Sequence, residues 1–285
     1  MARFDSDRTP MFCDTGLAER LEHVEAQLIA EASRAAHRRR ACADGFVMPI
    51  AGGVATFAEP GSPLNKVAGL GFAGTPRSSD LDEIERAFAT RGADVQIELA
   101  HLADPRVGAL LTGRGYRLAS FENVLGRALD GEVEPVNPRG VEVRRSGEDE
   151  FDVWLDVVTD GAAHPDTQGV LSHEDFPRDI IARAERDFAA AGVVRYLALR
   201  DTVPAGGAGL RIADGVAQLA GSATVPAHRR QGIHSALLTA RLTDAVAAGC
   251  DIAVVTTQPA SRSQQNVQRR GFDLLYTRAV LVKDA

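Results

Sequence analysis

The sequence predicts an α/β protein, a mixed sheet flanked by helices, built from two tandem copies of one unit. The length of 285 residues favours two domains, because one domain usually holds about 100–200 residues. Strand-like and helix-like patterns alternate through both halves of the chain. The halves also repeat each other in order: "RGYRLASFENVL" at 114–125 aligns with "RGFDLLYTRAVL" at 270–281, and "GADVQI" at 92–97 aligns with "GCDIAV" at 249–254.

Patterns in the first half predict a helix followed by a small α/β unit. The helix begins at a cap on Asp14 or Thr15, and its basic run at 37–40 is expected to be a solvated helix end. Apolar residues then recur at helical spacing: Leu17, Leu21, Val24 and Leu28. The remaining predicted elements are strands at 45–58, 65–74 and 93–100, helices at 79–92 (with a Ser/Asp cap) and 104–117, and a final strand or hairpin at 116–129.

A segment without periodicity separates the two predicted domains. We assign residues 1–130 to the first domain, 131–140 to a linker and 141–285 to the second domain. The second domain should begin with two helices, one marked by Trp154 and one opened by a capping box at Ser172 and Asp175. Strands at 193–200, 208–214, 216–225 and 251–257, helices at 234–249 and 261–271, and closing strands at 272–283 follow.

Composition and charge exclude several classes of function. Apolar residues make up 45% of the chain and charged residues 25%, which is ordinary for a soluble globular protein. The net charge of −7 argues against a nucleic-acid partner, which needs a basic face. No run reaches the ~20 apolar residues of a membrane helix, and the N-terminus does not resemble a signal peptide. The 3 cysteines form no zinc or CxxC pattern, so we expect a cytoplasmic protein without a membrane partner.

The stretch "TVPAHRRQGIHSALL" at 224–238 carries the chemistry. A strand-like run ends there, two arginines and a glycine follow, and a helix begins. Free N–H groups at a helix N-terminus, the small glycine and forked arginine donors together suit a pyrophosphate. The stretch is neither a Walker loop nor GxGxxG. These residues alone leave open the alternative of an exposed turn with two solvated arginines.

This stretch resembles the acyl-CoA motif of the GNAT N-acetyltransferase superfamily, V-x-P-x-x-R-x-x-G-x-G/A. Thr224 stands at the first position, Pro226 at the proline, Arg229 at the arginine, Gly232 at the glycine and His234 at the last small residue. The order of elements over 141–285 also resembles that family. The resemblance implies acetyl-CoA as co-substrate, no metal, and transfer of the acetyl group to an amine that attacks directly in a ternary complex.

The resemblance also implies which residues bind the co-substrate. The loop and helix start would hold the pyrophosphate, with charge from the two arginines, while the strand end would bind the pantetheine arm. Ser263 and Asn266 would flank it from the next helix, unless they are ordinary exposed polar residues. The remaining implied residues are Ala223, Thr224, Val225, Arg229, Arg230, Gln231, Gly232, Ile233, His234 and Ser235.

Departures from the family pattern leave the catalytic groups open. Val267 replaces the tyrosine that usually protonates the departing thiolate, and Tyr276 is a weak substitute. The strand before the motif lacks a carboxylate general base. His228, Glu174 and Asp160 are candidates, with solvated surface groups as the alternative. These gaps favour a second hypothesis, a non-catalytic acyl-CoA sensor or scaffold.

The first copy lacks the motif. "TPRSSDLDEIERAF" at 75–88 has no Arg-x-x-Gly, and its acidic residues would repel a pyrophosphate. We expect this copy to keep the fold without the cofactor and to form one wall of the acceptor cleft. The acceptor would be a small-molecule amine held by loops at 160–175 and 201–216. The tandem copies predict a monomer or homodimer, and His164, His173 and Glu174 are expected in loops rather than at a metal.

Overall fold

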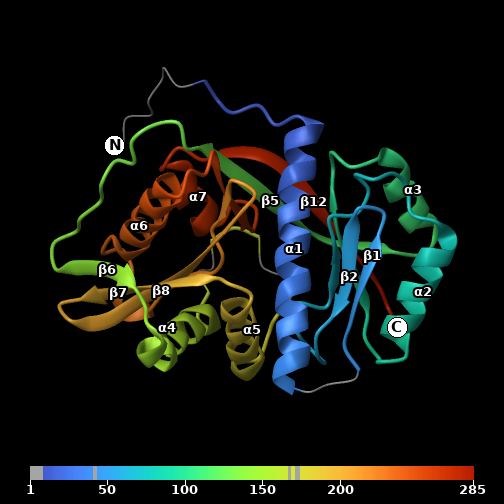
Figure 1. The fold of residues 1–285 in the computed structure, drawn as a ribbon, viewed down its shortest axis with the longest axis horizontal. Helices are drawn as coiled ribbons and strands as arrows, with labels where there is room; N and C mark the ends of the chain where they lie inside the picture. Colours follow the sequence, from blue (N-terminus) through green and yellow to red (C-terminus); the bar gives the residue numbers. More distant parts are fainter. Residues whose placement is uncertain (1–8, 41–43, 166–167, 171–173) are drawn as a thin grey trace.

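The computed structural model describes residues 9–40, 44–165, 168–170 and 174–285, which form one 12-stranded sheet with helices on both faces (Figure 1). The strand order is β1-β2-β3-β4-β12-β5-β11-β9-β8-β7-β6, with β10 beside β8. The first half contains α1 Thr15–Arg40, β1 Phe46–Ile50, β2 Gly53–Phe57, β3 Lys66–Ala68, α2 Ser78–Ala89, β4 Val95–Ala100, α3 Pro105–Gly113 and β5 Arg117–Ala128. The second half contains β6 Val141–Arg145, α4 Phe151–Ala163, α5 Arg178–Ala190, β7 Val194–Arg200, β8 Val203–Ala213, β9 Val216–Gln218, β10 Ser222–Thr224, α6 Ile233–Ala247, β11 Ile252–Thr257, α7 Arg262–Gln268 and β12 Asp273–Lys283. The predicted class, a mixed sheet flanked by helices, is confirmed.

The two halves exchange their last strands. β5, from the first half, pairs antiparallel with β11 of the second half. β12, from the second half, pairs antiparallel with β4 of the first half, and β5 and β12 also pair with each other. The hairpin that the sequence allows at the end of each copy is therefore replaced by one strand from each copy. Residues 131–140 form neither helix nor strand, but the sheet does not divide there.

An approximate twofold relation follows from the register of these strands. Glu122 and Arg278 occupy the same position in the aligned repeats at 114–125 and 270–281. They are also direct partners across the β5–β12 ladder. Two equivalent residues can face each other only at a symmetry axis, so the axis passes between these strands. The repeat detected in the sequence therefore describes the symmetry of the molecule.

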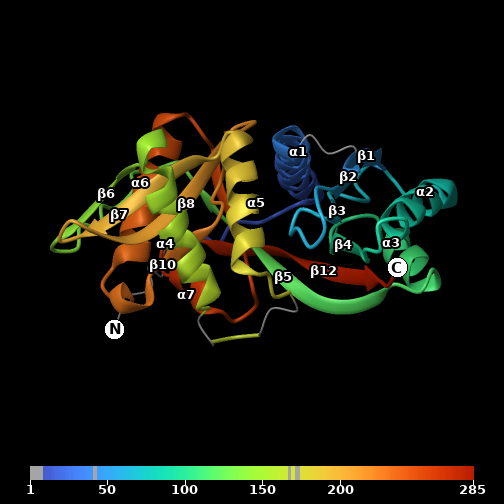
Figure 2. The same cartoon turned by 90° about the horizontal axis from the view of Figure 1, so that it is seen from below.

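Helices α1 and α5 lie side by side on one face of the sheet (Figure 2). In the second half, two adjacent glycines of β8 let helices approach from both faces. A Cβ on Gly206 would lie 2.6 Å from the Ile233 side chain of α6. A Cβ on Gly207 would lie 2.6 Å from the Val158 side chain of α4. Side chains on a strand alternate between faces, so α4 and α6 cover opposite faces of the sheet.

Helix α1 joins the halves through charged side chains as well as through its apolar stripe. Glu22 is almost fully buried, and its carboxylate lies 2.7 Å from the guanidinium of Arg278. Near the end of the helix, Arg39 donates two hydrogen bonds of 2.8 Å to the buried carboxylate of Asp187 on α5. The basic run predicted to be a solvated helix end instead includes this interdomain ion pair. It can do so because the second half supplies a buried carboxylate opposite the run.

The helix starts agree only partly with the caps predicted from the sequence. The Asp14 carboxylate accepts a hydrogen bond of 2.8 Å from the Leu17 amide, so the predicted cap of α1 is confirmed. Helix α2 begins after Arg77, without a side-chain cap, because the Asp80 carboxylate pairs with Arg77 instead. Helix α5 begins after Pro177 without a side-chain cap. The capping box predicted there consisted of Ser172 and Asp175. Asp175 does not cap the helix, and Ser172 lies outside the described residues, as does His173.

Candidate functional site

The sheet opens between β10 and β11. The parallel pairing of β9 with β11 reaches Gln218 opposite Val254, and the Leu219 amide still donates to the Val254 carbonyl at 2.9 Å. A bulge follows, in which the Gly209 amide of β8 donates to two successive carbonyls, of Ala220 and Gly221. Among the described strands, β10 then pairs with β8 alone. The edge of β10 that faces β11 is therefore left without a ladder partner.

The motif at 224–238 forms the turn that follows β10 and starts α6. Arg230 and Gly232 both have left-handed backbone, with φ of 61° and 82°. The first helical bond of α6 runs from the Ala236 amide to the Gly232 carbonyl at 2.9 Å. Within the described residues, the amides of 230–235 have no hydrogen-bond partner. Six unpaired N–H groups at the positive end of a helix of 15 residues can bind an anion.

The two arginines of the motif have different environments. The Arg229 guanidinium donates to main-chain carbonyls, to Thr224 at 3.2 Å and to His164 at the end of α4. These bonds attach the loop to α4, so the Arg229 charge is directed into the protein. Arg230 is exposed at the loop surface. Of the two charges assigned to the pyrophosphate from the sequence, the structure leaves that of Arg230 at the surface.

Three buried polar atoms beside the opening lack partners within the described residues. They are His234 Nδ1, at the start of α6, and Thr257 Oγ1 and Gln258 Oε1, at the end of β11. Burial, together with the nearby Arg241, lowers the pKa of His234 to about 4, so its ring is neutral. Unpaired buried polar atoms are costly and call for a missing partner. Their position on both elements that flank the opening fits a polar ligand between α6 and β11.

A cavity of about 210 Å³ lies at the opening, between the sheet and helices α1 and α5. Its apolar lining includes Leu21 and Leu28 of α1 and Phe188 of α5. Its acidic lining consists of Glu25 of α1 and Glu185 of α5. The first half of the chain therefore contributes, through α1, to a cavity next to the motif of the second half.

Glu185 is the acidic group closest to the bulge. A Cβ built on Gly221 would lie 3.2 Å from its Oε1, so the carboxylate rests against the Gly221 backbone. Within the described residues Glu185 has neither a hydrogen bond nor an ion pair. Burial raises the pKa of Glu185 to about 7. A carboxyl group with this pKa can accept and release a proton near neutrality.

The candidate catalytic residues from the sequence are not gathered at one point. Tyr276 lines the cavity, and its buried hydroxyl donates to Glu22 at 2.8 Å, while burial raises its pKa well above the usual value. His228 ends the short turn Pro226–His228 after β10. Asp160 lies on α4, half exposed, 3.6 Å from the His164 ring. Glu174 precedes α5 and contributes to the electrostatic environment of Lys66 in the first half.

The residues that flank the motif also differ in their surroundings. Ala223 lies at the centre of β10, and the Val225 amide donates back to the Ala205 carbonyl of β8 at 3.0 Å. On α7, Ser263 is exposed and Asn266 is half-buried. Val267, in the place of the family tyrosine, is buried in the apolar core. Within the described residues, no three histidine, cysteine, aspartate or glutamate side chains cluster as metal ligands would.

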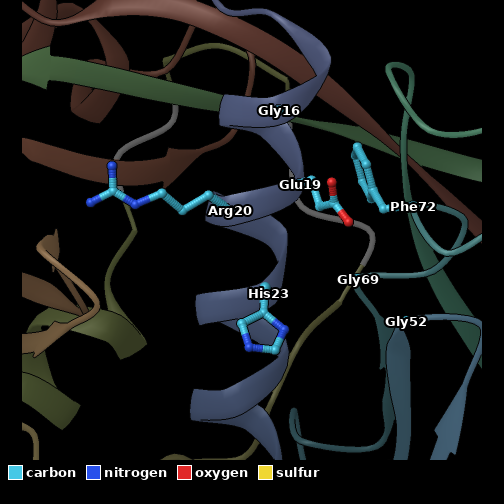
Figure 3. Close-up of a pocket in the computed structure, with 7 residues that line it drawn as sticks. All are labelled: Gly16, Glu19, Arg20, His23, Gly52, Gly69 and Phe72. Carbon is cyan, nitrogen blue, oxygen red and sulfur yellow. The ribbon is translucent and has the colours of Figure 1, made fainter.

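The corresponding region of the first half contains a hollow of about 300 Å³ on the other side of α1 (Figure 3). It is lined by Glu19 and His23 of α1, by Phe72 and by Gly69. Gly69 corresponds to Gly221 when "VAGLG" at 67–71 is aligned with "LAGSA" at 219–223. In Figure 3, Glu19 points toward Phe72, and Arg20 points away to the other side of the helix. Arg20 is held by an ion pair with Asp251. None of the described residues that line this hollow belongs to α2, the helix that follows the corresponding strand in the first half.

The split in the mixed sheet, the turn with unpaired amides and the cavity at the split lie together in the second half. Residues 162–272 match the acetyltransferase (GNAT) family. This part of the second half is therefore similar to a family whose chemistry is acyl transfer. No curated protein matches the sequence. Among the described helices, none is long and apolar enough to cross a bilayer.

Solved structures show the same fold over the whole chain. A GCN5-related N-acetyltransferase from Kribbella flavida matches with a TM-score of 0.62 and 22% identity, covering 90% of this chain and 96% of that one. A tandem GNAT protein from the clavulanic acid biosynthesis pathway matches with a TM-score of 0.60 and 11% identity, covering 97% of both chains. A GCN5-related N-acetyltransferase from Sphaerobacter thermophilus matches with a TM-score of 0.55 and 16% identity, covering 72% of this chain and 66% of that one. The chain therefore has the tandem GNAT fold.

Proposed function

We propose that the protein is an acetyl-CoA-dependent N-acetyltransferase with one working site, in the second half. The observation that carries this proposal is the split between β10 and β11, with unpaired amides on one side and a cavity containing Glu185 on the other. Acetyl-CoA, when bound, supplies the acetyl group as a thioester. The protein would supply binding, orientation and a proton acceptor.

The amides of 230–235 would hold the pyrophosphate, with Arg230 adding charge at the surface. Gly232 suits this role because its φ of 82° aligns successive N–H groups on one side of the turn. The unpaired edge of β10, around Ala223, would bind the pantetheine arm in the split. His234, Thr257 and Gln258 offer the buried polar atoms that lack partners.

Glu185 would act as the general base. An amine reaches the protein as an ammonium ion and must lose a proton before its nitrogen can attack the thioester carbon. The carboxylate at Gly221 would take that proton, the C–N bond would form, and the C–S bond would break. The sulfur would leave as a thiolate and take up a proton from water, because Tyr276, which lines the same cavity and is the sequence-based candidate for the acid, donates its hydroxyl proton to Glu22 at 2.8 Å.

Calorimetric titration with acetyl-CoA tests the co-substrate site. We expect one molecule bound per chain, and at least tenfold weaker binding in Arg230→Glu, because the variant places a negative charge at an anion site. Arg77→Glu is the matched control, since Arg77 precedes α2 as Arg230 precedes α6. It should bind acetyl-CoA as the wild type does.

Other results would assign the protein differently. Two molecules bound per chain would mean that the first half also has a site. No binding would contradict the proposal and favour a scaffold. Binding without release of free CoA thiol, when a set of amines is offered, would indicate a sensor.

A further inference from the structure

We infer that the acceptor is a compact primary amine with an apolar body and no carboxylate, and that Glu25 of α1 selects it. This inference rests on the proposed function. It follows from the charge, the apolar lining and the size of the cavity at the split.

The first step concerns the cation in the cavity wall. Arg278 lines the cavity, but its guanidinium is paired with Glu22 at 2.7 Å, and both side chains are almost fully buried. Its Nη1 atom is also 3.8 Å from carboxylate oxygens of Glu98 and of Glu122. With three carboxylates around it, Arg278 has no charge left over to attract an anionic substrate.

The second step concerns the two carboxylates of the cavity. Glu25 accepts one hydrogen bond, of 3.1 Å, from the neutral amide of Gln218. The Gln218 oxygen is itself occupied by Arg211, which pairs with Glu31 outside the cavity. Glu185 has no partner within the described residues. The cavity therefore carries uncompensated negative charge, which favours a cation and repels a substrate carboxylate.

The third step concerns the apolar walls. Leu21, Leu28 and Phe188 face the cavity from the helices, and Leu219 and Val255 from the strands. These side chains offer no hydrogen bonds, so a sugar would leave its hydroxyl groups unpaired. They suit an alkyl or aryl body.

The fourth step concerns size. The cavity of about 210 Å³ is somewhat larger than the ~150 Å³ apolar cavity that holds benzene in another protein. A single ring or branched alkyl group with a short aminoalkyl arm fills such a space. Glu185 lies at the bulge and Glu25 on α1, so the ammonium end would face the split while the body packs between the helices.

A matched series of acceptors tests the inference with acetyl-CoA present. We expect 2-phenylethylamine to be acetylated with kcat/KM about 100-fold above that of L-phenylalanine, which adds a carboxylate to the same skeleton. Binding of 2-phenylethylamine should be measurable by calorimetry with desulfo-CoA, independently of turnover. The neutral isostere 2-phenylethanol should not bind under these conditions.

Variants of α1 separate selection from stability. Glu25→Gln should raise KM for 2-phenylethylamine at least tenfold and reduce the discrimination against L-phenylalanine, with little change in kcat. Glu19→Gln is the control, because Glu19 lies on the same helix but lines the hollow of the first half instead of this cavity. Unfolding midpoints of both variants should match the wild type to within a few degrees.

The outcomes also separate this inference from the proposed function. If the protein binds acetyl-CoA and acetylates amino acids or peptides in preference to 2-phenylethylamine, the acceptor inference is wrong and the proposed function stands. Unchanged discrimination in Glu25→Gln would remove Glu25 from the argument. If acetyl-CoA itself does not bind, the proposed function fails first.

Discussion

The two halves of this protein share a fold and differ in how the sheet is closed beside the corresponding turn. In the first half, the Asp104 amide donates to the Gly71 carbonyl at 3.0 Å, which joins the end of β4 to the loop after β3. In the second half, Ser261 caps α7 as Asp104 caps α3. The Ser261 amide donates instead to the Gln258 carbonyl of its own loop, at 3.3 Å, and the split remains open.

Helix α1 also packs differently against the two copies. A Cβ on Gly69 would lie 3.1 Å from the Glu22 carbonyl and from the Ala26 side chain, so the helix backbone rests on the first copy. At the corresponding Gly221, the nearest group is the Glu185 carboxylate, and a cavity remains. The comparison indicates that the split sheet leaves room for a ligand in the copy where α1 does not rest on the bulge.

The largest expected effect comes from Glu185→Gln, which removes the proposed proton acceptor from the open copy. We expect kcat/KM to fall roughly 10²- to 10⁴-fold while acetyl-CoA affinity stays within twofold. Glu19→Gln, in the hollow of the closed copy, is the control and should leave kcat/KM unchanged. Steady-state release of CoA thiol measures both, and equal rates in the wild type and Glu185→Gln would exclude Glu185 as the base.

The pH profile sharpens the same comparison. Because burial raises the pKa of Glu185 to about 7, the carboxyl group is protonated below that pH and cannot accept a proton. The wild-type kcat/KM should therefore rise about tenfold per pH unit below 7 and level off above it. Glu25, Tyr276 and Arg278 line the same cavity, and Glu122, whose pKa burial also raises, lies behind Arg278. The pH dependence should survive in Glu122→Gln and vanish in Glu185→Gln.

Breaking the buried ion pair between α1 and β12 should cost stability. Glu22→Ala leaves the Arg278 guanidinium buried without its nearest carboxylate, and we expect a loss of about 3–5 kcal/mol in the free energy of unfolding. Denaturant unfolding measures this loss. Glu19→Ala, one turn earlier on the same helix, should cost less than about 1 kcal/mol. Equal losses would mean that the buried pair is not what holds α1 to the second half.

The smallest expected effects come from two glycines with left-handed backbone, Gly232 in the second half and Gly69 in the first. Gly232→Ala strains a residue with φ of 82° and places a Cβ 2.6 Å from Pro138, so the turn must shift. We expect about 1–2 kcal/mol of destabilisation and roughly tenfold weaker acetyl-CoA binding. Gly69→Ala, with φ of 72°, should cost similar stability without weakening the binding of acetyl-CoA. Weaker binding in both variants would point to a shared site.

Much of this architecture could be predicted from the sequence because its signals are local. The repeat, the alternation of elements and the Arg-x-x-Gly turn each occupy short stretches, and the structure contains them. The strand exchange could not be predicted, since β5 and β12 have similar patterns and either could pair with either neighbour. Glu185 was missed because it looks like a surface charge within the polar run "RAERD" at 183–187. Its burial depends on α1, which is distant in the sequence.

The residues that line the cavity could not be predicted from local sequence signals either. Loops at 160–175 and 201–216 are the sequence-based expectation for the acceptor, whereas the cavity is lined by helices α1 and α5 and by the strands at the split. Glu25 lies on a helix whose apolar spacing already accounts for its packing. A charged residue on such a helix is read as solvated until its partner from the other half is known.

The exchange of β5 and β12 makes the covalent link between the halves dispensable in principle. Residues 131–140 carry no regular structure, and each half holds the other through a full strand ladder on both sides of the junction. A chain cleaved in that segment should stay together as a complex, in the manner of two complementing fragments. Neither fragment alone should fold, because each would lack the strand that finishes its sheet. The two halves of the chain are in this sense comparable to two different subunits joined by a linker.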